Sequence, residues 1–86
     1  MTEMVGDMSL LVTQIVQAIV DAPEQVQVAA VEDGDVMVLE LRVAPTDMGR
    51  VIGRQGRTVK SMRTLLGAAS MKLQQRYELE VIEEDE

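Results

Sequence analysis

Two glycines, Gly53 and Gly56, lie three residues apart between apolar helical segments and are the strongest constraint on the fold of this 86-residue chain. Before them, Met48, Val51 and Ile52 follow the i, i+3, i+4 spacing of a short helix. Gly53 is expected to end that helix, because helix C-termini commonly need a left-handed residue, which glycine adopts without a Cβ penalty. Gly56 is expected to open the next helix. The two residues between the glycines are then the tip of an outward-pointing loop.

This loop combines the features of an anion site. Backbone N–H groups and a helix N-terminus attract negative charge, and both are expected beside Arg54 and Gln55. From residue 49 to residue 76 the chain has no acid and seven cations, namely Arg50, Arg54, Arg57, Lys60, Arg63, Lys72 and Arg76. The net charge is −7, but salt screens charges beyond about 8 Å, so a phosphate at the loop experiences mainly the basic stretch. We therefore expect a phosphodiester, held by the N–H groups of Arg54, Gln55 and Gly56.

Other glycine motifs, metal sites and catalytic sites are excluded by residue type. A P-loop or a dinucleotide fingerprint would need glycine at Val51, and a P-loop would also need lysine at Arg57. The chain has no cysteine and no histidine, which leaves no nucleophile–base pair and no thiolate or imidazole ligand. Residues 32–35 indicate a tight hairpin turn, because Asp-Gly supports the positive φ angles that two-residue turns require. A calcium site is not expected there, because the 12-residue ligand pattern is missing. No enzyme activity, metal, cofactor or small-molecule substrate is expected.

Local signals divide the chain into six main elements. The N-terminus has no signal-peptide pattern, and no stretch approaches the ~20 apolar residues of a membrane span, which favours a soluble, cytoplasmic protein. Proline at position 23 ends the first helix, and Thr46 or Asp47 is expected to cap the short helix through its side chain. The predicted elements are a helix at 4–20, strands at 25–31 and 36–43 around a turn at 32–35, helices at about 48–52 and 57–75, a strand at 77–82, and an acidic tail at 83–86 that should fray.

Apolar spacing predicts which faces form the core. One face of the long second helix carries Val59, Met62, Leu66, Ala69 and Leu73. Alternate residues from Met37 to Val43 form the apolar face of the second strand, and Tyr77 is expected in the core. The wide apolar stripe of the first helix is core, with a partner-binding surface as the alternative. Residues 67–69 are small, which suits either a close neighbour or a neutral surface.

The element order α-β-β-α-α-β predicts an α+β fold with helices packed on one face of a three-stranded mixed sheet. The first two strands form an antiparallel hairpin. A right-handed crossover through the two helices then makes the third strand the parallel neighbour of the second.

The segment Val51–Met62, with the sequence VIGRQGRTVKSM, resembles the helix, GxxG loop, helix core of a KH domain, whose loop clamps about four unpaired nucleotides. The element order resembles that of a type II KH domain, and the resemblance covers residues 1–82 as a single domain. In size the chain resembles the KhpA family of small bacterial proteins with one KH domain. This resemblance implies a cytoplasmic RNA chaperone that acts as a homodimer or with a larger KH-containing, KhpB-like protein, and that influences cell shape and cell wall biogenesis.

We therefore predict that single-stranded RNA is bound in three ways. Loop residues Gly53, Arg54, Gln55 and Gly56 hold phosphate, and Arg50, Arg57 and Lys60 add cationic contacts. Bases lie on an aliphatic groove formed by Val51, Ile52 and Val59, although Ile52 suits the core equally well. With no Phe or Trp, stacking worth about 1–3 kcal/mol per base is missing, so affinity should be low. The alternatives are a protein-interaction module with vestigial nucleic-acid binding, and a binder of single-stranded DNA.

Overall fold

The structure, a computed structural model, describes the backbone of residues 2–83 and the side chains of residues 7–83. It confirms the predicted α+β order. The elements are α1 (Thr2–Gln17), β1 (Gln27–Asp33), β2 (Val36–Arg42), α2 (Met48–Ile52), α3 (Arg57–Leu73) and β3 (Arg76–Val81), with single 3-10 turns η1 (Pro23–Gln25), η2 (Pro45–Asp47) and η3 (Arg54–Gly56). Of the acidic tail predicted at 83–86, residues 84–86 lie outside the described residues.

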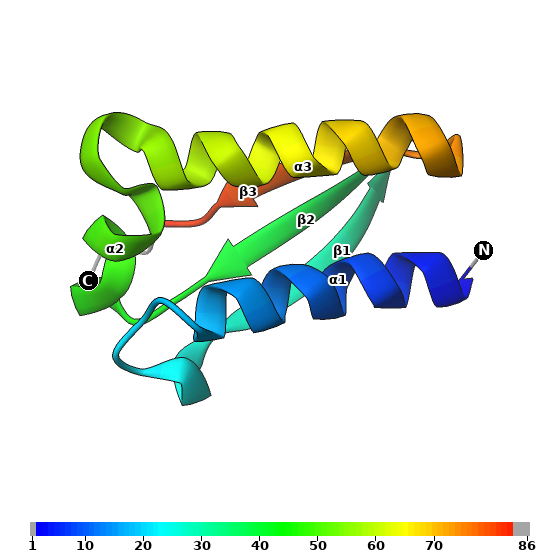
Figure 1. The fold of residues 1–86 in the computed structure, drawn as a ribbon. Helices are drawn as coiled ribbons and strands as arrows, with labels where there is room; N and C mark the ends of the chain where they lie inside the picture. The colour runs from blue at the N-terminus through cyan, green and yellow to red at the C-terminus, as the bar shows by residue number, and fades with distance from the viewer. Residues whose placement is uncertain (1, 84–86) are drawn as a thin grey trace.

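The three strands form a mixed sheet with β2 at its centre. Strand β2 pairs with β1 in antiparallel fashion and with β3 in parallel, as predicted. Figure 1 shows α1 and α3 on the same side of the sheet, with α1 near β1 and α3 near β3. Helix α2 and the loop that follows it lie at one end of this arrangement, where the chain turns into α3. The GxxG loop is therefore at an end of the helical layer.

The core lies between the sheet and the two long helices. Leu39 and Leu41 of β2 have no exposed surface. They pack with buried residues of the surrounding elements, Val12, Val16, Val26, Val51, Val59, Met62, Leu66, Tyr77 and Leu79. The burial of these residues confirms the predicted core face of α3 and the core position of Tyr77. Burying a large apolar side chain stabilises the fold by about 1.5–3 kcal/mol.

Most element boundaries differ from the prediction by one to three residues, and three of these differences have a clear local reason. Strand β1 continues to Asp33, which pairs with Val36, so the turn is only the two residues at 34–35. Helix α1 ends at Gln17 because its last turn tightens, with the N–H of Ile19 donating to the oxygen of Val16 at 3.0 Å. Helix α3 ends at Leu73 because the next residue, at position 74, is left-handed with φ 57°.

The predicted side-chain cap of α2 is wrong. Neither candidate, Thr46 nor Asp47, makes a capping hydrogen bond to α2. Asp47 is instead buried, with 1% of its surface exposed. Its two carboxylate oxygens accept hydrogen bonds from the backbone N–H groups of Asp21 and Ala22, each at 3.0 Å. A buried carboxylate requires such donors, and these donors tie the connection between α1 and β1 to the start of α2.

Candidate nucleic-acid interface

Both loop glycines lie at the predicted positions, but their backbone conformations differ from each other, and that of Gly53 differs from the prediction. Gly53 ends α2, and its N–H donates to the oxygen of Gly49 at 2.8 Å. Its φ of 80° and ψ of 168° lie in a region that is essentially restricted to glycine, rather than in the left-handed helical region that was expected. A Cβ at Gly53 would also overlap the Thr58 side chain and lie 2.8 Å from the Thr58 nitrogen. Gly56 opens α3 with φ 73° and ψ 14°, and a Cβ there would meet no atom within 4 Å.

The tip of the loop points outward, as predicted. Arg54 and Gln55 are exposed, and Gln55 is left-handed with φ 58°. The N–H of Gly56 donates to the Gly53 oxygen at 3.1 Å, and the N–H of Arg57 donates to the Arg54 oxygen. The prediction that the Gly56 N–H group is free for a phosphate is therefore wrong in this conformation. Within residues 2–83, the loop donors that remain are the N–H groups of Arg54 and Gln55.

The cations around the loop fall into two groups. Arg54, Arg57 and Lys60 are exposed, and none forms an ion pair with another described residue. Arg50 differs, because its Nη2 lies 3.2 Å from the Asp21 carboxylate and its Nε lies 3.9 Å from that of Asp47. The three unpaired cations follow one another along the loop and the first turn of α3. Together they form a basic surface beside the N–H groups of Arg54 and Gln55, which is the arrangement that binds phosphates.

The aliphatic groove predicted from Val51, Ile52 and Val59 is not formed by these side chains. Val51 is fully buried and Val59 is 7% exposed, because both pack against the sheet. Only Ile52 is half-buried and reaches the surface. Val51 and Val59 are therefore core residues on either side of the loop. A base cannot contact Val51 without a change in the core.

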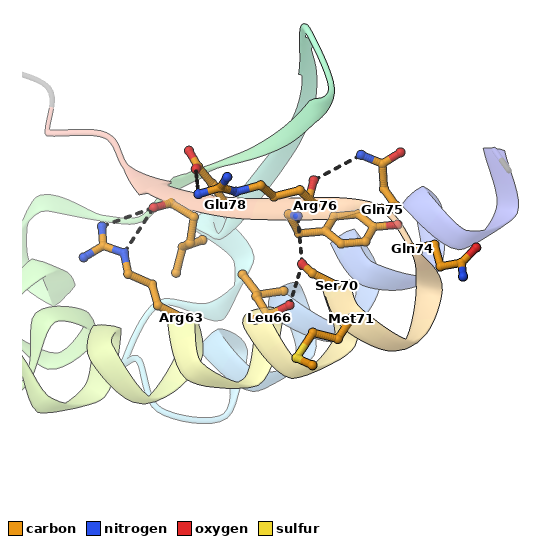
Figure 2. A pocket seen from close by; sticks show the side chains of 11 residues that line it. Arg63, Leu66, Ser70, Met71, Gln74, Gln75, Arg76 and Glu78 are labelled. Atoms are coloured by element: carbon orange, nitrogen blue, oxygen red, sulfur yellow. Dashed lines mark hydrogen bonds and ion pairs between the residues drawn. The ribbon is translucent and has the colours of Figure 1, made fainter.

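A different groove runs between α3 and the outer edge of β3 (Figure 2). We name it the α3–β3 groove, and its volume is about 710 Å³. It is lined by Arg63, Leu66, Gly67, Ser70, Met71, Gln74, Gln75, Arg76, Tyr77, Glu78 and Leu79. A Cβ at Gly67 would meet no atom within 4 Å, so the absence of a side chain there leaves the groove open rather than admitting a close neighbour.

Side chains of α3 occupy the outer edge of β3 inside this groove. Arg63 donates from Nε and Nη2 to the Leu79 oxygen, at 3.3 and 3.1 Å. The hydroxyl of Ser70 accepts the N–H of Tyr77 at 2.9 Å and donates to the oxygen of Leu66 at 2.8 Å. Figure 2 shows both contacts as bridges from the helix to the strand. They satisfy strand groups that no fourth strand covers within residues 2–83.

One buried polar group near the groove has no partner. The Tyr77 hydroxyl makes no hydrogen bond with any described residue. Burial raises the pKa of Tyr77 above the ordinary value of 10.0, and the nearby carboxylate of Asp7 raises this pKa further. The hydroxyl therefore stays protonated through the physiological range.

The rest of the described structure provides two further observations. No helix between residues 2 and 83 combines the length and apolarity needed to cross a membrane. Across the same residues, acidic side chains do not gather in groups of three or more that would hold a metal ion.

Comparison with known families agrees with this architecture. A family model described as "KhpA/KhpB, KH domain" matches residues 9–81. The chain belongs to the KhpA/KhpB family of KH domains. Proteins named "RNA-binding protein KhpA" are similar to it over most of its length. Those of Clostridium acetobutylicum and Halalkalibacterium halodurans are each 45% identical over 75 and 76 residues, which cover 87% and 88% of this chain and all of each relative. That of Borreliella burgdorferi is 40% identical over 73 residues, 85% of this chain and 89% of the relative.

Sequence reasoning missed two features of this KH domain. Arg63 was recognised only as part of the basic stretch, whereas it lines the α3–β3 groove and bonds β3. The contacts of Arg50 with Asp21 and Asp47 were also missed. The only indication in the sequence was the i, i+3 spacing of Asp47 and Arg50. The first feature depends on how α3 packs on β3. The second depends on the hydrogen bond that brings Asp21 beside Asp47, 26 positions further along the chain.

Proposed function

We propose that this KH domain, a single domain over residues 1–82, binds single-stranded RNA by holding its phosphodiester backbone at the loop Gly53–Gly56. The observation that carries the proposal is the pair of N–H groups without a backbone partner, at the exposed residues Arg54 and Gln55, beside cations without acid partners among the described residues. The names of the relatives support RNA as the ligand. The proposed activity is binding rather than catalysis, as an RNA chaperone and post-transcriptional regulator in the cytoplasm.

The proposed path of the RNA follows α3 from its N-terminus. A phosphate lies at the N–H groups of the loop, and Arg57 and Lys60 contact the next phosphates. The bases then face the α3–β3 groove, with Arg63 along its wall. Arg63 donates from Nε and Nη2 to the Leu79 oxygen, and the other N–H groups of its guanidinium are donors for the acceptor edge of a base.

A second candidate function is supported by a separate surface. Between α1 and α3 lies a shallow apolar groove that includes the exposed Leu11 and Leu65. Exposed apolar patches of this kind mark protein contacts. We therefore retain the alternative of an interaction module, and we propose that this surface supports a homodimer or a heteromer with a larger, KhpB-like protein. A role in cell shape and cell wall biogenesis would follow from that assembly.

The loop assignment is tested with matched charge reversals. Arg54→Asp should abolish retention of a short unstructured RNA, and adding Gln55→Asp should have no smaller effect, because both place a carboxylate where the phosphate lies. Lys72→Asp, an equal change in charge at an exposed residue of α3, should weaken binding only slightly. Far-UV circular dichroism should stay unchanged in all three variants. The melting temperature should stay unchanged in the two loop variants and fall slightly in Lys72→Asp, because Lys72 lies in the last turn of α3, where a cation is favourable. Equal losses from Arg54→Asp and Lys72→Asp, or full retention by the loop variants, would refute the assignment.

The choice between RNA and DNA needs one competition experiment. Matched RNA and DNA oligonucleotides of the same sequence differ at the 2′-OH and at the thymine methyl. RNA should compete more strongly than DNA for the wild-type protein. Equal competition would favour a general binder of single strands.

A further inference from the structure

Arg50, on α2 just before the loop, is held by two carboxylates. Its Nη2 lies 3.2 Å from Oδ2 of Asp21 and its Nε lies 3.9 Å from Oδ1 of Asp47. Arg50 and Asp21 are nevertheless open to solvent, with 56% and 77% of their side chains exposed. The contact between them is therefore accessible to an RNA strand at the loop.

The position of Asp21 is fixed by the fold. Its backbone N–H and that of Ala22 donate to the buried carboxylate of Asp47, each at 3.0 Å. Hydrogen bonds from backbone N–H groups to a carboxylate are of the stronger kind. These two bonds anchor the main chain of Asp21 against the start of α2. The exposed carboxylate of Asp21 is thereby held close to Arg50. Asp47 is thus a positioning residue for Asp21, because its side chain holds the backbone of Asp21, and it also lies 3.9 Å from the Nε of Arg50.

A carboxylate and a phosphate compete for the same guanidinium. The planar N–H fork of arginine matches both groups. Arg54, Arg57 and Lys60 have no acid partner among the described residues, whereas Arg50 does. We propose that Asp21 is an internal competitor of the RNA phosphate for Arg50, and that it holds RNA affinity below the level that the cations around the loop would otherwise reach. This inference rests on the proposed function.

The direct test is Asp21→Asn, which removes the side-chain charge and leaves the two backbone bonds to Asp47 in place. Affinity for a short unstructured single-stranded RNA should rise about two- to fivefold at low salt, the range expected for an exposed ion pair. If Arg50 gains a phosphate contact, the log–log salt slope should steepen by about 0.7. Circular dichroism and melting temperature should show the same fold as the wild type.

Two controls separate competition at Arg50 from a general change in charge. Glu24→Gln makes the same charge change at an exposed residue of the same connection, and Glu24 forms no ion pair with a described residue. It should leave affinity and salt slope nearly unchanged. In an Arg50→Gln background, Asp21→Asn should give no gain. An equal gain from Glu24→Gln, or a gain that persists without Arg50, would overturn the inference.

The two proposals fail in different ways. Wild-type protein that retains no RNA would remove the proposed function and the inference with it. Wild-type protein that retains RNA through Arg54, together with an Asp21→Asn variant of unchanged affinity and salt slope, would overturn the inference alone.

Discussion

Alanine at each of the two loop glycines should destabilise the fold by different amounts. Gly53, at φ 80° and ψ 168°, occupies a region that costs other residues about 1–3 kcal/mol. A Cβ there would also lie 2.8 Å from the Thr58 nitrogen, a backbone atom in the first turn of α3. This atom cannot move away without shifting the helix, so the cost should be near the upper end of that range.

Gly56 provides the matched comparison. At φ 73° and ψ 14° it is left-handed, which costs an L-residue about 1–2 kcal/mol, but a Cβ there meets nothing within 4 Å. Alanine also reduces the entropy of the unfolded chain at either position, which returns about 0.4–1 kcal/mol. The net loss of unfolding free energy should therefore be about 2 kcal/mol or more for Gly53→Ala and about 1 kcal/mol for Gly56→Ala.

Urea unfolding followed by circular dichroism measures both variants. A loss of about 2 kcal/mol lowers the midpoint by roughly 1 M if the slope is near 2 kcal/mol/M and unchanged. Gly53→Ala should also lose more RNA affinity than Gly56→Ala under conditions where both are folded, because the displaced first turn of α3 carries Arg57. Equal losses of stability, or a larger loss for Gly56→Ala, would show that the loop does not have this geometry.

The core, the tyrosine and the basic surface give three further predictions. Leu39→Ala should cost about 2–5 kcal/mol in urea unfolding, because Leu39 is fully buried; a loss of less than about 1 kcal/mol would contradict the described core. Burial and Asp7 raise the pKa of Tyr77 above 10.0, so folded protein keeps a proton that unfolded protein loses. The contribution of Tyr77 to the free energy of unfolding should therefore be constant below about pH 10 and fall above it. Tyr77→Phe, which loses no hydrogen bond to a described residue, should be neutral or stabilising at about pH 7 and should remove this part of the fall. Tyrosinate absorbance of the single tyrosine gives the pKa directly. Finally, two to four phosphate contacts should give a log–log salt slope of about −1.4 to −3 for RNA binding, and a slope near zero would contradict an electrostatic clamp.

The features predicted correctly from the sequence are those set by local patterns. The glycine pair, the apolar face of α3 and the hairpin between β1 and β2 each depend on residues close in sequence. Those patterns also fixed the strand order, because a parallel third strand is the usual result of a helical crossover.

The features that were predicted wrongly or missed depend on packing between distant segments. Asp47 was expected to cap α2, but its carboxylate binds the connection after α1. The sequence does not show that this connection, 26 residues earlier, lies beside α2. Likewise, Ile52 suits a groove and the core equally well in the sequence and is half-buried in the fold, whereas Val51, which was expected in the groove, is fully buried. Arg63 reaches the Leu79 oxygen across 16 residues for the same reason.

The central claim is that the loop N–H groups hold an RNA phosphate, and a titration of isotope-labelled protein with a short single-stranded RNA tests it most directly. The amide NMR signals of Arg54 and Gln55 should shift most, followed by those along the first turn of α3. Shifts concentrated on β1, with the amides of Arg54 and Gln55 unchanged at saturation, would contradict the claim.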